Sequence, residues 1–389
     1  MNVLIASFTF PPNRDGVSAA AELMATGFAQ RGWTVDVATE PATDLRPQLH
    51  QRIRVHEFNI RGGLHPRNPF TGDVEEYRLF LLSDHWDVIV FHSYAWTVYV
   101  AAPLLPSLRA KKILVSHGFG ALIWTRRRRF PYGLGSWFLS AYQSVIALKW
   151  MRSIDRLVVL SNRVDFGTFY DHLLAKAAGR PPIAVIPNGV DLDETCLGNS
   201  NFRERIGAGV DTFVFLCVAH YSERKDQGYA ARAFRRAGLE NALLVFIGPE
   251  FNEFSERFRA EDARLASPCE LKRIVWMEKQ NRRDTVGALE TCDAFVLSAK
   301  HEAQPIAILE AMRSGKPWIS RNAGCVSEIP GGLVVRSERQ MCRAMRDLAR
   351  KPRLCSELGT EGLEAVRSTF NRSEYLRAYC QILEKVTSV

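Results

Sequence analysis

Two glutamates separated by seven residues, Glu302 and Glu310, have the spacing that best suits ligand chemistry in this chain. An apolar run that predicts a strand, Asp293 to Ser298, ends in a polar loop with Glu302, and Pro305 then fits the first turn of a predicted helix carrying Glu310. Free N–H groups at a helix start favour anions and hydroxyl-rich ligands, and open α/β sheets bind ligands at the carboxyl ends of their strands. We therefore expect both carboxylates to face one ligand; the alternative is a loop with two solvated carboxylates.

The elements that must position these residues alternate between strand and helix along the chain. In the first half, strands are expected at 3–6, 33–39, 53–58, 88–91, 113–116, 157–160 and 183–186. A first helix is expected to end near residue 32, and further helices are expected over 74–83, 95–109, 136–152 and 163–178. In the second half, strands are expected at 213–219, 243–247, 274–277, 294–298 and 318–320, with helices over 227–237, 253–264 and 282–290. Such alternation predicts parallel sheets with helical crossovers.

Length and composition indicate a soluble globular protein of two domains. The chain has 389 residues, more than one core usually fills, with 47% hydrophobic and 24% charged residues. Its eight cysteines lie in the second half without a C-x-x-C pair, which predicts reduced core thiols of a cytosolic protein. We expect no signal peptide and no membrane-spanning helix. The net charge of +9 favours an anionic partner or surface.

Five short motifs, in order along the chain, resemble those of the retaining glycosyltransferases with a GT-B fold, glycosyltransferase family 4. The motifs are PPNRDG, His117-Gly118, PNGVD, SERK and the glutamate pair, each at a strand end. The resemblance implies an α/β protein of two doubly wound Rossmann-like domains facing across a cleft. It further implies an acceptor-binding domain over 1–187, a nucleotide-sugar domain over 188–372, and a C-terminal helix, 373–389, that packs back on the first domain.

Residue roles follow from the same resemblance. Glu302 and His117 would contact the transferred sugar and act as the catalytic residues, and Glu310 would bind the ribose. The remaining donor-binding residues would hold the diphosphate or support the sugar through backbone N–H groups: Gly16, His220, Arg224, Lys225, Gln304, Pro305 and Ile306. Cations at the diphosphate would neutralise charge as the nucleoside diphosphate leaves. Solvated loops are the alternative interpretation of the charged motifs.

The chain departs from the family pattern at several of these positions. Val17 replaces the second glycine of the first motif, His220 stands where an arginine is usual, and Ala303 and Gln304 stand where an aromatic and a small residue are common. Near the chain's later strands Gly324 and Glu328 match the pattern, whereas Cys325 replaces a glycine. These departures leave open a second interpretation, in which the chain is a non-catalytic relative that has kept the fold.

The segment from Trp124 to Ile154 combines four consecutive arginines, Arg126, Arg127, Arg128 and Arg129, with aromatic residues such as Trp137. Arginines beside apolar residues suit an anionic membrane interface, where each cation adds about 1 kcal/mol. We therefore expect peripheral membrane contact on the acceptor side, on the inner face of the cytoplasmic membrane. The alternative is a core helix preceded by a solvated arginine loop. Nucleic acid is not expected, because no recognised binding module accompanies the arginines.

The segment VIPNGVD is expected to link the two domains, with a turn of positive φ at Asn188-Gly189. Asp191 and Asp193 form a D-x-D pattern within it. We do not expect them to bind metal, since they lie in this turn and the resembled family needs no metal there; no cofactor is expected.

The function predicted from the sequence is transfer of a sugar from a nucleotide diphosphate-sugar to a hydroxyl of a glycan or lipid-linked glycan, with retention of configuration. Two alternatives remain: a non-catalytic scaffold or assembly protein, and an epimerase- or hydrolase-like GT-B enzyme without an acceptor.

Overall fold

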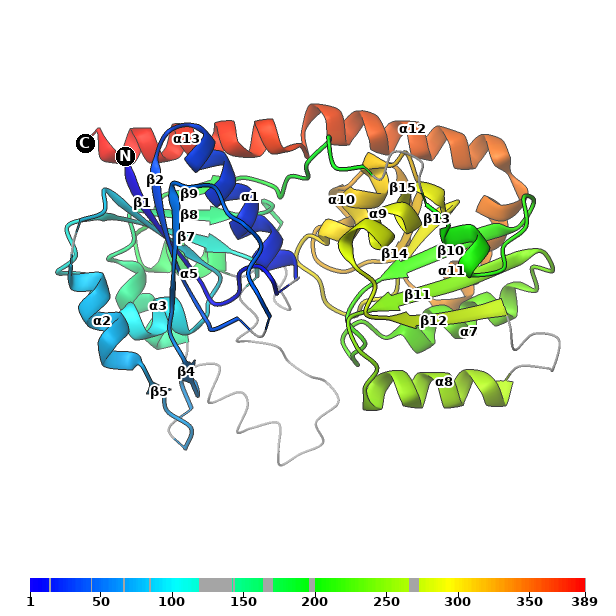
Figure 1. The fold of residues 1–389 in the computed structure, drawn as a ribbon, viewed down its shortest axis with the longest axis horizontal. Helices are drawn as coiled ribbons and strands as arrows, with labels where there is room; N and C mark the ends of the chain where they lie inside the picture. The colour runs from blue at the N-terminus through cyan, green and yellow to red at the C-terminus, as the bar shows by residue number, and fades with distance from the viewer. Residues whose placement is uncertain are drawn as a thin grey trace. The chain divides into compact units, whose positions relative to one another are not determined.

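The chain forms two compact units in the computed structural model (Figure 1). The structure describes residues 1–388 except 14, 43, 66, 84, 119–141, 143, 164–170, 196–199 and 266–272. Unit 1 comprises Met1–Asn188 and Ser373–Val389, and unit 2 comprises Gly189–Arg372.

Unit 1 is built on a parallel sheet of seven strands in the order β3-β2-β1-β6-β7-β8-β9. Its strands are β1 (Asn2–Ser7), β2 (Thr34–Thr39), β3 (Ile53–Glu57), β6 (Val88–His92), β7 (Lys111–Ser116), β8 (Arg156–Val159) and β9 (Ile183–Val185), with a small antiparallel ribbon of β4 (Ile60–Arg61) and β5 (Thr71–Gly72). The order reverses direction between β1 and β6, so the loops after these two strands diverge to opposite sides of the sheet.

The central strands of unit 1 are apolar on both faces because helices cover both sides. In β1, Val3 and Ile5 pack on one cluster while Leu4 and Ala6 pack on the other, as the two-residue period of a strand requires. On the first face lie α1 (Gly16–Gln30) and α13 (Arg372–Thr387); on the second lie α2 (Val74–Leu82), α3 (Trp96–Ala101), the helical segment 144–151 and α5 (Asp171–Ala177).

Unit 2 repeats this design with a parallel sheet of six strands in the order β12-β11-β10-β13-β14-β15. Its strands are β10 (Phe213–Val218), β11 (Ala242–Gly248), β12 (Ile274–Glu278), β13 (Ala294–Leu297), β14 (Trp318–Arg321) and β15 (Gly332–Val335). Its helices are α6 (Phe202–Arg205), α7 (Gln227–Ala237), α8 (Glu253–Leu265), α9 (Arg282–Thr291), α10 (Ile306–Arg313), the 3-10 turn η2 (Val326–Glu328), α11 (Glu338–Arg350) and α12 (Pro352–Ser368). Here the strand order reverses between β10 and β13.

The C-terminal helix α13 packs on the first unit. Tyr379 and Leu383 are fully buried in the cluster formed with α1 and the sheet, and the Tyr375 hydroxyl donates to the carbonyl of Ala20 at 3.3 Å. The apolar residues of this helix all contact that cluster, to different degrees. Tyr375 and Cys380 belong to the buried side, whereas Leu376 and Ile382 are only partly buried.

Several elements differ from their predicted form for identifiable reasons. The helix expected over 95–109 ends at Ala101, since Pro103 and Pro106 follow and proline disfavours a helix interior. Asn188 and Gly189 do not adopt positive φ; instead Val190 forms a parallel bridge with Asn371. The strand β15 and the helices α11 and α12 are additional to the predicted elements.

Six of the eight cysteines lie in the described part of the chain, and all six are free thiols. Five are buried and Cys355 is partly exposed, which confirms the prediction of core thiols for these positions. Burial raises the pKa of the Cys217 and Cys292 thiols to about 12, so both stay protonated near neutral pH.

Candidate active site

The loops after β10 and β13 lie side by side at the point where the strand order of unit 2 reverses. Open α/β sheets bind ligands in the crevice outside the carboxyl ends of the strands at such a point. The loop after β10 carries Lys225 and the loop after β13 carries Glu302. The two side chains that the sequence assigned to a diphosphate and a sugar are therefore brought to one place by the topology.

Lys225 and Glu302 form an ion pair, in which Nζ of Lys225 donates to Oε1 of Glu302. Both side chains are largely buried, with 14% and 8% of their surface exposed. Two further hydrogen bonds join the loops: the Ser298 hydroxyl donates to the carbonyl of Lys225 at 3.0 Å, and the Lys300 N–H donates to the carbonyl of Arg224 at 2.8 Å. The ion pair therefore lies between two loops that hydrogen bonds hold together.

The N-terminus of α10 lies directly after Glu302 and has no side-chain cap. Pro305 occupies the N-cap position with extended backbone, one residue before the helix, rather than the first turn as predicted. Gln304 and Pro305 are buried and Ile306 is partly exposed. By contrast, the start of α9 is capped by Asn281, whose side chain accepts from the N–H of Asp284 at 2.8 Å. Pro305 itself thus gives no capping hydrogen bond to the first N–H groups of α10, and a helix start of this kind suits a ligand with oxygen acceptors.

Gly324 packs closely against the backbone of the loop that carries Glu302. It has φ of +56°, and a Cβ added there would lie 2.0 Å from the carbonyl oxygen of Glu302 and 2.3 Å from that of Ala303. The neighbouring N–H of Cys325 donates to the carbonyl of Ala303 at 3.0 Å. Glycine is therefore required here by both its left-handed backbone and the close approach of the loop.

Glu310 belongs to a separate network of ion pairs, in which acidic and basic side chains alternate. Arg282 at the start of α9 contacts both Glu310 and Glu194, and Arg313 contacts Glu194 at 2.8 Å. Arg313 also donates to the carbonyl of Asp191 at 3.0 Å. Burial alone would raise the pKa of Glu194, but Arg282 and Arg313 lower it to about 2. The predicted ribose-binding carboxylate is thereby held in place by the segment that opens unit 2.

The other predicted cations of the first loop are solvent-facing. His220 and Arg224 are both exposed, whereas Asp226 ends the loop with left-handed backbone, φ +48°, and pairs with Arg321 at 3.1 Å. Asp191, the first aspartate of the D-x-D pattern, pairs with Arg372 at 3.1 Å. Lys225 is therefore the cation of this loop that the structure places against Glu302.

In unit 1, His117 follows β7 and lies beside a histidine that sequence reasoning missed. Its Nε2 is 3.3 Å from Nδ1 of His92, the last residue of β6, and the two rings are nearly parallel. His92 is fully buried, while His117 keeps some exposure. Burial lowers the pKa of His117 to about 4, against an opposing effect of Asp15, and burial lowers the pKa of His92 well below its usual range. Both imidazoles are neutral near pH 7.

The loop after β1 offers less to an anion than the sequence predicts. Asp15 caps α1, and its Oδ1 accepts from the N–H groups of Val17 and Ser18 at 2.8 and 2.9 Å. Gly16 is exposed at the first position of the helix. Since a carboxylate already occupies these N–H groups, a diphosphate would have to displace Asp15.

The predicted membrane segment lies largely outside the described residues, including Arg126, Arg127, Arg128, Arg129 and Trp137. Within the described helical segment 144–151, Ala147, Trp150 and Met151 are core residues. Tyr142 and Val145 are instead about half exposed, at 50% and 54%. The described part of this segment is therefore a core helix with apolar side chains left on its outer side.

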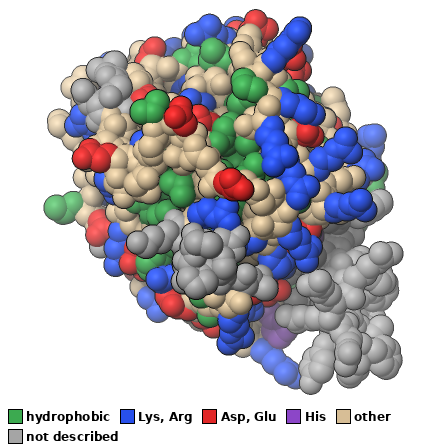
Figure 2. Space-filling model, turned by 90° about the vertical axis from the view of Figure 1, so that its right-hand side faces the viewer, with side chains coloured by type: hydrophobic (Ala, Val, Ile, Leu, Met, Phe, Trp, Pro, Cys, Tyr) green, Lys and Arg blue, Asp and Glu red, His purple; other side chains and the backbone are tan. Residues whose placement is uncertain are grey.

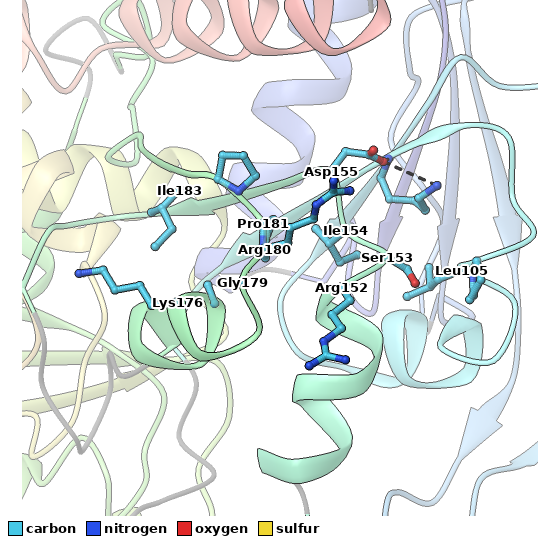
Figure 3. A pocket seen from close by; sticks show the side chains of 14 residues that line it. Leu105, Arg152, Ser153, Ile154, Asp155, Lys176, Gly179, Arg180, Pro181 and Ile183 are labelled. Carbon is cyan, nitrogen blue, oxygen red and sulfur yellow. Dashed lines mark hydrogen bonds and ion pairs between the residues drawn. The ribbon is translucent and has the colours of Figure 1, made fainter.

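Figure 3 shows an open depression in unit 1. His92 and His117 lie at the other edge of the sheet, at the carboxyl ends of β6 and β7. The wall of the depression includes Asp155 and Ile183, at the amino ends of β8 and β9. Lys112 lies at its inner side, where Nζ donates to the carbonyls of Leu108 and Ala110 at 3.1 Å each. The same ammonium group also pairs with Asp155 at 3.6 Å. The depression is separate from the strand ends that carry the candidate site.

Sequence reasoning missed four contributors: His92, Arg282, Glu194 and the bracing role of Gly324. His92 carries one readable signal, a histidine that ends the apolar run VIVFH. Arg282 and Glu194 carry none, because 88 residues separate them and an exposed ion pair would use the same residue types.

Comparisons with known proteins agree with this geometry. The family Glycosyltransferase Family 4 matches residues 14–194, and the family Glycosyl transferases group 1 matches residues 199–350. A curated relative, the UDP-Gal:alpha-D-GlcNAc-diphosphoundecaprenol alpha-1,3-galactosyltransferase of Escherichia coli, is 33% identical over 150 residues. That match covers 36% of this chain and 36% of the relative, so it spans about a third of either protein.

Solved structures share the whole fold at low sequence identity. The sucrose-phosphate synthase of Thermosynechococcus elongatus superposes with a TM-score of 0.78 at 15% identity, covering 100% of this chain and 99% of that one. HepE of Anabaena, solved with UDP-glucose, gives 0.74 at 16% identity over 100% of both chains. WaaG, a glycosyltransferase of lipopolysaccharide biosynthesis, gives 0.72 at 16% identity over 97% and 98%.

Two parallel-sheet units, each with its polar residues at the carboxyl ends of the strands, place this protein in the GT-B class of folds. With the two family matches in consecutive halves of the sequence, the chain belongs to glycosyltransferase family 4, the glycosyl transferases group 1.

Proposed function

We propose that the protein is a retaining glycosyltransferase that moves a hexose from a UDP-sugar to a hydroxyl of a glycan or lipid-linked glycan. The observation that carries this proposal is the buried Lys225–Glu302 pair at the switch point of unit 2, beside the uncapped start of α10. Uridine is the base to test first, since UDP-galactose appears in the name of the Escherichia coli relative and UDP-glucose is bound in HepE.

In the proposed reaction, the bond between the sugar's C1 and the β-phosphate oxygen breaks while a bond from C1 to the acceptor oxygen forms on the same face. The acceptor's proton passes to the departing phosphate oxygen, so the products are UDP and a glycoside of unchanged anomeric configuration. Lys225 would stabilise the charge that develops on the diphosphate. Glu302 and the N–H groups at the start of α10 would hold the sugar, and no carboxylate nucleophile is needed.

Further side chains would contact the donor's ribose, sugar and diphosphate. Glu310 would accept from the ribose hydroxyls, held by Arg282 in the orientation seen here. His117, neutral near pH 7, would contact hydroxyls of the donor sugar from unit 1. The charge on the diphosphate would be met by Lys225, with the exposed Arg224 and His220 close in sequence, so the proposed reaction needs no metal.

For the acceptor we propose a glycan on an anionic or lipid carrier, used at the inner surface of the cytoplasmic membrane. The Escherichia coli relative is named for an acceptor on diphosphoundecaprenol. Val145, on the outer side of the segment 144–151, and Tyr142, just before that segment, supply exposed apolar surface to such a contact. No helix in the described residues is long and apolar enough to cross a membrane. On the face shown in Figure 2, basic side chains lie with acidic ones among them.

The test is thermal unfolding of the full chain with a panel of nucleoside diphosphates and nucleotide sugars, on wild type and Lys225→Ala. A ligand at 100 times its Kd adds about 2.7 kcal/mol to the stability of the state that binds it. We expect a shift with UDP and one UDP-hexose that is weakened in Lys225→Ala. The matched control is Arg353→Ala, which removes an exposed cation of the same unit, 92% exposed on α12.

Each outcome of this panel has a defined meaning. If a nucleotide with another base raises the melting temperature and Lys225→Ala weakens that shift, the proposed donor site stands and the donor's base is not uridine. A shift that Lys225→Ala and Arg353→Ala leave equally large would remove Lys225 from the diphosphate site. No shift with any member of the panel would overturn the transferase assignment in favour of a non-catalytic relative. Release of free sugar without transfer would indicate the hydrolase-like alternative.

A further inference from the structure

The buried histidine at the end of β6 is outside the roles described so far. His92 has no exposed surface, lies within an otherwise apolar strand, and reaches two partners: His117 through Nδ1 at 3.3 Å, and the Sδ of Met24 on α1 through Nε2 at 3.4 Å. A histidine kept for packing alone gains little from a second histidine beside it. The two contacts of His92 instead determine which ring nitrogens of the two histidines carry protons.

Only one proton can lie between the two rings. Each neutral imidazole has one N–H donor and one bare nitrogen acceptor. If Nδ1 of His92 carried its proton, the bare Nε2 would face the sulfur of Met24, and neither atom has a hydrogen to donate. If Nε2 carries it, the N–H meets the sulfur, a weak acceptor, and Nδ1 is free to accept from His117. The second arrangement leaves no buried polar atom of His92 without a partner.

The same logic then fixes His117. Its Nε2 must carry a proton in order to donate to Nδ1 of His92, so its Nδ1 is bare. Because His92 occupies the Nε2 side, Nδ1 is the ring nitrogen that remains for a ligand. A bare Nδ1 accepts hydrogen bonds and cannot donate them.

We propose that His92 is a positioning residue that locks His117 in the Nε2–H tautomer, so that His117 offers its Nδ1 as an acceptor to a hydroxyl of the bound sugar. This rests on the proposed function for the identity of the ligand, but the tautomer itself is a property of the ligand-free protein. The low pKa of both rings, caused by burial, keeps the pair neutral and the assignment unambiguous near pH 7. The lock also explains a polar side chain at the end of a strand whose other residues, Val88 to Phe91, are fully buried and apolar.

The tautomer is measured by nitrogen NMR on the full chain with 15N-labelled histidine, at pH 7.5 and without ligand. The His117 signals are assigned by their loss in His117→Gln. We expect a protonated Nε2 and a bare Nδ1 in wild type. In His92→Leu, which removes the acceptor, we expect a mixture of both tautomers. Met24→Leu, a substitution of similar volume that removes only the sulfur, should weaken the preference without disturbing the strand.

Activity supplies the second readout. Loss of the outer partner that orients a metal-ligating histidine costs about 10- to 100-fold in metal affinity or activity. We expect a loss of about that size in kcat/KM for the donor in His92→Leu, with KM for the acceptor unchanged. His92→Asn places an amide oxygen near the position of Nδ1 and should recover most of the activity and of the tautomer preference. A packing defect would not be repaired by asparagine, which is smaller and more polar.

The outcomes separate this inference from the proposed function. A protonated Nδ1 on His117 in wild type overturns the inference, whatever the activity. A wild-type tautomer that persists in His92→Leu also overturns it, because His92 would then not be its cause. If the tautomer behaves as expected but no nucleotide sugar binds, the lock stands and the transferase assignment fails.

Discussion

Among single residues, Lys225 balances the charge of Glu302, which is largely buried. Replacing Lys225 by methionine leaves a buried carboxylate without its partner, which we expect to lower the free energy of unfolding by about 1–3 kcal/mol. Glu302→Gln keeps a hydrogen-bond acceptor for the lysine and should cost less. Urea unfolding of both single variants measures this difference.

The double variant Lys225→Met/Glu302→Gln provides the control for that prediction. With the carboxylate gone, the methionine no longer strands a buried charge, so the double variant should be more stable than Lys225→Met alone. A double variant whose loss equals the sum of the two single losses would mean that the ion pair contributes nothing beyond packing.

The pKa of His117 makes stability depend on pH in a defined direction. The unfolded histidine has a pKa near 6.5 and the folded one about 4, so between these values the unfolded state binds more protons. The contribution of His117 to the free energy of unfolding is therefore fully present above pH 6.5, and it is lost as the pH drops toward 4. Linkage gives a loss of about 2 kcal/mol between pH 7 and pH 5. His117→Gln should remove about that much of the pH dependence in urea unfolding, whereas substitution of the exposed His65 should not.

At the scale of elements, the loop after β13 depends on a glycine in another segment. Gly324→Ala adds strain at φ +56° and a methyl group 2.0 Å from the carbonyl oxygen of Glu302, so the loop must move. We expect UDP affinity to fall at least about tenfold, since Glu302 and the start of α10 shift together and each 1.4 kcal/mol is a factor of ten. Isothermal titration with UDP measures it.

Gly238 offers a matched control for this prediction. It also has positive φ, +59°, and caps the end of α7, but a Cβ there would meet nothing within 4 Å. Gly238→Ala therefore imposes similar backbone strain without the contact, and UDP binding should be unchanged. Equal losses of affinity in the two variants would show that general destabilisation, not displacement of the loop, is responsible.

Elements with strong local signals were predictable, and those whose form depends on distant partners were not. The strands β1, β6 and β10 each contain an uninterrupted apolar run of at least four residues, so pattern alone identifies them. β15 has only four residues, Gly332–Val335, which follow a glycine and a proline, and its pairing with β14 is what makes it a strand. The glutamate loop was found from spacing, but its brace from Gly324 and the link from Glu310 through Arg282 join segments far apart in the sequence.

For the whole molecule, the residues of the proposed donor site and the C-terminal helix belong to different units. Lys225, Glu302 and Glu310 belong to Gly189–Arg372, while α13 packs in the core of the unit that starts at Met1. Leu383→Ala removes a fully buried side chain of α13 and should cost about 2–5 kcal/mol in that unit. UDP should stabilise unit 2, which carries the proposed donor site.

Hydrogen exchange of the full chain can resolve the two effects, because exchange reports the stability of each cooperative region separately. We expect UDP to slow exchange in 219–226 and 298–313, and Leu383→Ala to speed exchange in β1, α1 and α13 while leaving protection by UDP intact. The reasoning is local: α13 contributes Tyr379 and Leu383 to the cluster shared with α1, and that cluster includes no residue of unit 2. If Leu383→Ala abolished the protection that UDP gives to 298–313, the two units would not be energetically separate, and the donor site would require an intact unit 1.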